Sequence, residues 1–85
     1  MASEHTITIT VETTRGPKIL TVDKTTKVSE VIANVVTLCG FSPGDRFELF
    51  LKTDLQHPLQ AERPLVSYHV GDGAVLVLSQ IGSGV

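Results

Sequence analysis

The stretch that decides the fold is His5-Thr6-Ile7-Thr8-Ile9-Thr10-Val11-Glu12. Its apolar residues alternate with threonine and glutamate, which predicts a strand with one apolar face and one polar face. Every residue from 6 to 11 is β-branched, and such residues favour a pleated surface. The alternation resumes at Leu20 and Val22, after Arg15-Gly16-Pro17 has interrupted it. We therefore expect a β-hairpin, with Gly16 supplying the unusual backbone angles of its turn.

The next segment has helical spacing instead. Apolar side chains recur at intervals of three and four, at Val28, Val31, Ile32, Val35, Val36 and Leu38. This spacing predicts a helix with one apolar side. Asp23 or Thr26 is expected to cap its start, and Gly40 and Pro43 to end it. Because valine is a mediocre helix former, burial against the rest of the protein must hold this helix.

The second half of the chain adds two strands. Alternation predicts a strand over residues 46–52, followed by a polar segment anchored by Leu55 and Leu59. A short turn or single helical turn is expected at residues 65–70, and a strand buried on both faces at residues 74–78. Residues 79–85 are predicted to be a flexible tail, which leaves residues 1–78 as one domain. The order predicts an α+β fold, a β-grasp in which a mixed sheet of four to five strands packs on one helix.

Composition excludes several classes of function. The 85 residues suffice for one small domain, and 41% of them are hydrophobic, which is too many for a disordered chain. A net charge of −2 argues against a nucleic-acid partner. No apolar run is long enough for a membrane span, so no membrane partner is expected. One cysteine and no leader-like N-terminus indicate the cytoplasm.

The residue types that carry chemistry are scattered. His5, His57 and His69 are far apart and lack the spacing of metal ligands. Cys39 has no neighbouring base or cation to activate its thiol, so a small buried side chain is expected there. Neither Gly-x-Gly element precedes a helix or a Lys-Ser/Thr pair, as a nucleotide loop requires. We therefore expect no catalytic residue, no metal and no cofactor, and a protein that is not an enzyme.

The element Leu65-x-x-Tyr68-x-Val70-Gly71-x-Gly73 resembles the Leu-x-x-Tyr-x-Ile element that precedes the last strand of ubiquitin-like proteins. The hairpin, the helix and the glycine after it also lie where that family places them. The resemblance covers nearly the whole chain. It implies a ubiquitin-like β-grasp in which the tyrosine ring packs and its hydroxyl bonds a nearby loop, a role we carry onto Tyr68.

The last residues depart from the family pattern. Conjugated members end in Gly-Gly, whereas this sequence ends Ile81-Gly82-Ser83-Gly84-Val85. The resemblance implies a protein modifier of prokaryotic type, in which a peptidase removes Val85 and exposes Gly84. Its partners would be activating (E1-like) and carrier (E2-like) enzymes and the processing peptidase. The tail that reaches their active sites would include Gly82 and Ser83.

The surface departs from the family as well. With Phe47 pointing inward, Glu48 and Phe50 point outward, and Arg15 occupies the hairpin turn, so the apolar patch of ubiquitin is not reproduced. These three residues form the predicted interaction surface. Two alternatives to the modifier remain open, a non-covalent interaction module like those of some bacterial secretion systems and a sulfur carrier. A homo-oligomer stacked through an unprotected edge of the first strand is also possible on sequence grounds.

Overall fold

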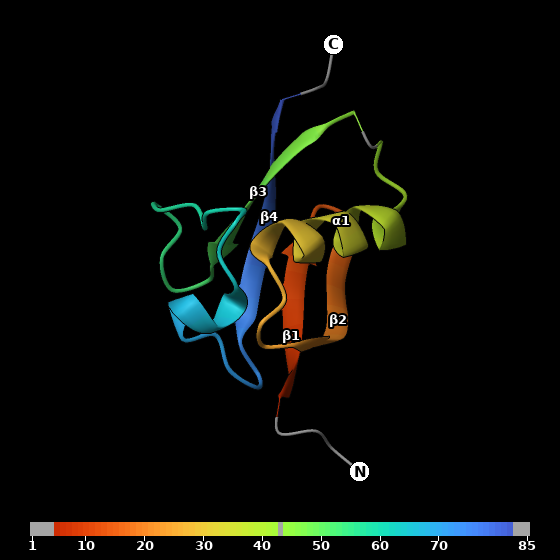
Figure 1. Ribbon diagram of the computed structural model, residues 1–85. Helices are drawn as coiled ribbons and strands as arrows, with labels where there is room; N and C mark the ends of the chain where they lie inside the picture. Colours follow the sequence, from red (N-terminus) through yellow and green to blue (C-terminus); the bar gives the residue numbers. More distant parts are fainter. Residues whose placement is uncertain (1–4, 43, 83–85) are drawn as a thin grey trace.

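The structure is a computed structural model and describes residues 5–42 and 44–82. Over those residues the chain forms four strands, one α-helix and one 3₁₀ helix (Figure 1). They are β1 (Thr6–Thr13), β2 (Gly16–Asp23), α1 (Val28–Cys39), β3 (Arg46–Leu51), η1 (Leu65–Tyr68) and β4 (Val75–Gly82). The predicted α+β composition and element order are confirmed.

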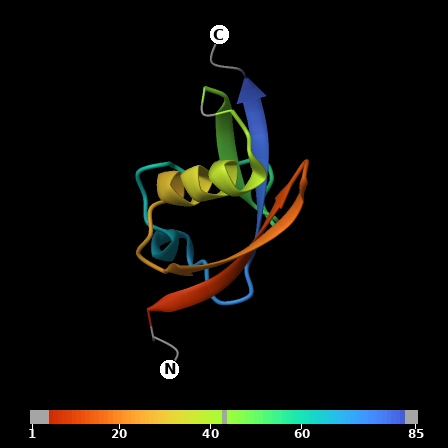
Figure 2. The same cartoon turned by 90° about the vertical axis from the view of Figure 1, so that its right-hand side faces the viewer.

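The four strands make one mixed sheet in the order β2-β1-β4-β3. β1 pairs antiparallel with β2 and parallel with β4, and β3 pairs antiparallel with β4. The helix α1 crosses one face of this sheet, and no helix within residues 5–42 and 44–82 covers the other face (Figures 1 and 2). Because β1 lies in the centre, the predicted stacking through its edge is wrong, and the outer strands are β2 and β3.

The core lies between α1 and the sheet. Thirteen hydrophobic side chains are buried there: Ile7, Ile9, Val11, Val28, Val31, Val35, Cys39, Leu49, Leu59, Leu65, Val70, Leu76 and Leu78. The predicted apolar side of the helix is confirmed, except that Leu38, in the last turn, is 57% exposed. Leu59 anchors the segment after β3 as predicted, whereas Leu55 is exposed.

The two ends of α1 differ in how their backbone groups are satisfied. The predicted cap at Asp23 or Thr26 is wrong, since the Asp23 carboxylate instead accepts hydrogen bonds from the N–H and hydroxyl of Thr25. The first N–H groups of the helix donate to backbone carbonyls of segment 61–63, at 3.0 Å. Gly40 ends the helix with φ 72°, as predicted. Segment 61–63 is thereby held against the start of the helix.

The last strand is longer than the sequence suggested. β4 continues through Gly82, so the predicted flexible tail is wrong for residues 79–82. Ser79, Gln80 and Gly82 are in register with the first half of β3. That half of β3 pairs with this part of β4, and a paired strand is more stable than an unpaired one. Residues 83–85, which include the predicted conjugation positions Gly84 and Val85, lie outside the described residues.

The expected role of Tyr68 is confirmed. Its hydroxyl oxygen accepts a hydrogen bond of 2.8 Å from the Gln60 N–H. We predict that Tyr68→Phe lowers the free energy of unfolding by about 1 kcal/mol, since it removes this bond and leaves the ring in place. Urea unfolding measures the change. Gln60→Ala is the control because it keeps the backbone N–H, and a loss as large in this control would contradict the assignment.

Candidate functional site

The side chains of β3 alternate between the two faces of the sheet. Leu49 is fully buried under α1, with Phe47 and Leu51 packed against the same core. Glu48 and Phe50 therefore point to the uncovered face, as predicted, and both are half-buried there. Sheet pairing places Phe50 directly opposite Val77 of β4. The two apolar side chains are thus neighbours on one face of the sheet. Figure 2 shows that no helix of the described residues covers this face.

An ion pair borders this contact. Glu12 of β1 pairs with Val77 on the side away from β3. The Lys52 Nζ lies 2.6 Å from the Glu12 Oε1, so the side chain of this lysine, the first residue after β3, reaches across β4 to β1. Both side chains are about half exposed, and such a pair contributes little to stability. It supplies a polar margin to the apolar contact of Phe50 and Val77.

Arg15 belongs to a different part of the molecule. Its Nη1 donates a hydrogen bond of 2.6 Å to the Cys39 carbonyl at the end of α1. Its guanidinium carbon lies 4.7 Å from the centre of the Phe41 ring, which allows a cation–π contact. The side chain thus joins the hairpin turn to the helix and does not share the face that carries Glu48 and Phe50. The structure brings together two of the three predicted surface residues.

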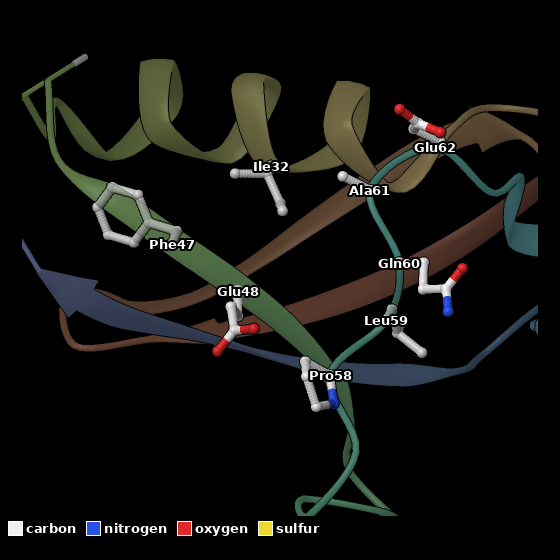
Figure 3. A pocket seen from close by; sticks show the side chains of 8 residues that line it. All are labelled: Ile32, Phe47, Glu48, Pro58, Leu59, Gln60, Ala61 and Glu62. Carbon is white, nitrogen blue, oxygen red and sulfur yellow. The ribbon is translucent and has the colours of Figure 1, made fainter.

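A second feature lies beside β3, at the edge of the sheet (Figure 3). A cavity of 430 Å³ opens between α1, β3 and the segment that follows β3. Its lining residues are Ile32, Phe47, Glu48, Pro58, Leu59, Gln60, Ala61 and Glu62. A second cavity of 270 Å³ continues along α1 and shares Ile32 and Phe47 with the first. Together we call these two cavities the edge groove.

The two carboxyl groups with shifted pKa values lie in turns. The side-chain hydrogen bond from Thr25 lowers the pKa of Asp23, with help from the Thr25 N–H. The hydrogen bond with the His57 ring lowers the pKa of Asp54, whose carboxylate is 3.0 Å from Nδ1. Both carboxyl groups are exposed and bonded within two or three residues. They stabilise turns and do not point into the edge groove.

Chemistry-bearing side chains are not gathered in one place. Residues 5–42 and 44–82 contain no group of three or more His, Cys, Asp or Glu side chains suited to a metal ion. Cys39 is buried, with its Sγ 3.6 Å from the Thr13 hydroxyl. His69 ends η1 in the left-handed conformation, and its side chain is exposed. In the same part of the chain, no helix has the length and apolar character needed to span a membrane.

Solved structures with the same architecture cover almost the whole chain. A protein designed on the basis of ubiquitin matches with a TM-score of 0.79 and 19% identity, covering 96% of each chain. The ubiquitin of Caldiarchaeum subterraneum matches with a TM-score of 0.77 and 24% identity, covering 94% of this chain and 99% of that one. This chain has the ubiquitin-like β-grasp fold. A ubiquitin-like domain of an Arabidopsis thaliana protein also matches, with a TM-score of 0.75, 20% identity and coverage of 94% and 82%.

No protein-family model and no curated protein sequence matches this chain. The assignment of the ubiquitin-like fold thus rests on similarity to solved structures. The function must be inferred from the surfaces of this chain, namely the sheet face that carries Glu48 and Phe50 (the Phe50 face) and the edge groove. Sequence patterns identified the outward residues of β3 but missed the edge groove. The only available signals were Leu59 as an anchor and the two prolines that interrupt residues 53–64.

Proposed function

We propose that this ubiquitin-like chain is a non-covalent protein-interaction module. The supporting observation is the uncovered sheet face, where Phe50 lies against Val77 and is bordered by the Lys52–Glu12 ion pair. Aromatic side chains with a polar margin are typical of the energetically important centre of an interface. The module is passive: it presents a rigid sheet face to a partner protein. The cytoplasm is the compartment we expect.

A covalent modifier is the second candidate. The similarity to an archaeal ubiquitin favours it. In this alternative, a peptidase removes Val85, an activating enzyme adenylates Gly84, and a carrier enzyme transfers it. Pairing of residues 79–82 with β3 argues for the first candidate, because the tail available to enter an enzyme begins after Gly82 rather than after Leu78.

One experiment separates the two candidates. The tagged chain is expressed in its source cells, and partners are recovered under native and denaturing conditions, with and without ATP depletion. For an interaction module, we expect partners to dissociate in denaturant and to be retained by a variant lacking Gly84. A covalent adduct that survives denaturant, needs ATP and disappears without Gly84 would overturn this proposal in favour of the modifier.

Two point variants test the binding face. We expect Phe50→Thr to reduce native recovery of partners by at least about tenfold, since it removes the aromatic side chain and keeps a strand-forming residue. Asn34→Asp is the control, because Asn34 is exposed on α1, away from this face. Circular dichroism verifies that both variants are folded. Equal recovery by Phe50→Thr and the unaltered chain would exclude this face.

A further inference from the structure

The outer edge of β3 has backbone groups directed away from the sheet. The Lys52 N–H donates to the Val75 carbonyl of β4, whereas the Leu49 carbonyl accepts a hydrogen bond of 2.8 Å from the Leu59 N–H on the opposite side. Since strand backbones alternate with a period of two, the N–H and C=O of Phe47 point to the same side as those of Leu49. Among the described residues, no turn or loop backbone group bonds to Phe47 there.

Phe47 itself lines both cavities of the edge groove. Ile32, Phe47, Pro58, Leu59 and Ala61 supply apolar walls to the larger cavity, and Figure 3 shows these side chains surrounding the space in front of β3. A volume of 430 Å³ falls within the range of roughly 300–1,000 Å³ that is typical of binding pockets. If a peptide pairs as a strand with Phe47, one of its apolar side chains can be buried in this cavity.

The charged side chains found along the groove are acidic. Glu48 and Glu62 line the larger cavity, and Asp45 lines the smaller one. No lysine or arginine is among the described residues that line either cavity. Acidic groups that line a pocket attract cationic partners and oppose acidic ones. The groove therefore complements lysine or arginine side chains that flank an apolar residue.

We propose that the edge groove binds a short, extended, basic and apolar peptide segment, which adds as a strand beside Phe47. The backbone of the peptide exchanges hydrogen bonds with the N–H and C=O of Phe47. One apolar side chain enters the cavity beneath Ile32, and flanking basic side chains reach Glu48 and Glu62. The added strand is short because the Leu59 N–H already occupies the carbonyl of Leu49.

Glu48 belongs both to this groove and to the Phe50 face, but Ile32, Ala61 and the backbone of Phe47 do not take part in that face. The groove proposal therefore stands whether or not the proposed function is correct. The test uses a fluorescent peptide of about eight residues in which lysine alternates with leucine, with binding followed by anisotropy. Two matched peptides are compared with it. In one, glutamate replaces lysine, and in the other the central amides are N-methylated. We expect both to bind at least about tenfold more weakly. The glutamate peptide is repelled by the acidic groove, and the N-methylated peptide lacks the backbone N–H donors that pair with β3.

Protein variants locate the site. We expect Ala61→Trp to weaken binding at least about tenfold by filling the cavity, while Gln56→Trp in the exposed loop leaves it unchanged. Ala61 is exposed, and its carbonyl accepts a hydrogen bond from the Ser29 N–H of α1, which the variant keeps. The pair Glu48→Gln with Glu62→Gln is expected to weaken binding about fivefold or more and to reduce its dependence on salt. Circular dichroism confirms folding.

Nuclear magnetic resonance distinguishes the remaining outcomes. We expect peptide-induced amide shifts at Phe47, Ile32 and Ala61. Shifts centred on Phe50 and Val77 would overturn the groove proposal and support the sheet face instead. Equal binding of the N-methylated peptide would rule out strand addition, and equal binding of the acidic peptide would rule out charge selection. Shifts at the groove that depend on protein concentration alone would identify a second copy of the chain as the occupant and overturn the peptide proposal.

Discussion

Leu65→Ala is expected to lower the free energy of unfolding by about 3 kcal/mol, the largest effect of any substitution considered for this protein. Leu65 is fully buried at the start of η1, where its side chain joins the core. The change removes apolar contacts and leaves a cavity that the surrounding helix and sheet cannot fill. A domain of this size has a total stability of roughly 4–13 kcal/mol, so the loss is a large part of it.

Urea unfolding followed by circular dichroism measures this loss. Val66→Ala is the matched control, because Val66 is the next residue in η1 and is 43% exposed. We expect the control to change the free energy of unfolding by less than about 0.5 kcal/mol. Similar losses in the two variants would show that η1 does not pack as described, with Leu65 inward and Val66 outward.

Arg15→Ala is expected to lower the free energy of unfolding by about 2 kcal/mol. The variant removes the hydrogen bond to the Cys39 carbonyl and the contact of the guanidinium with the Phe41 ring. It also removes a positive charge from the C-terminal end of α1, where the helix dipole favours one. Charged hydrogen bonds and cation–π contacts contribute about 1–3 kcal/mol and 0.5–1 kcal/mol respectively, and partial exposure reduces the sum.

Arg15→Lys separates charge from shape. Lysine keeps the positive charge but lacks the planar guanidinium that stacks on the ring and bonds the carbonyl together, so we expect it to recover less than half of the loss. Thermal unfolding of the three proteins in parallel gives the comparison. If Arg15→Ala left stability unchanged and weakened partner recovery, Arg15 would belong to the interaction surface, as the sequence suggested.

The sequence predicted one of the two candidate surfaces, the face with Glu48 and Phe50, and did not predict the edge groove. Alternation along β3 correctly predicts that Glu48 and Phe50 point away from the helix, because side chains on a strand have a strict period of two. Arg15 was predicted on the same surface because it occupies the hairpin turn, which contributes to the apolar patch of ubiquitin. Its partners are 24 and 26 residues further along the chain, and no local pattern encodes contacts at that separation.

The edge groove was not predictable for the same reason. Its walls come from α1, β3 and residues 58–62, and the last of these follows no period that indicates structure. Residues 61–63 are held in place because their carbonyls accept hydrogen bonds from the first N–H groups of α1. The sequence suggested that a side chain, Asp23 or Thr26, would cap these groups instead. Side-chain caps and distant carbonyls satisfy the same donors, so a sequence alone does not distinguish them.

The resemblance to ubiquitin-like proteins implied the bond made by Tyr68. By itself the sequence determined the order of the elements, the apolar faces of β1 and β3, and the helix with its end at Gly40. These features follow from local periodicity and backbone preferences, both of which depend on a few neighbouring residues. The tertiary structure alone decided where β4 ends, which carbonyls accept hydrogen bonds from the first N–H groups of α1, and which groups Arg15 contacts. It also decided that a groove lies beside Phe47. Each of these depends on partners distant in the chain, since backbone donors and acceptors are satisfied by whichever groups folding brings next to them.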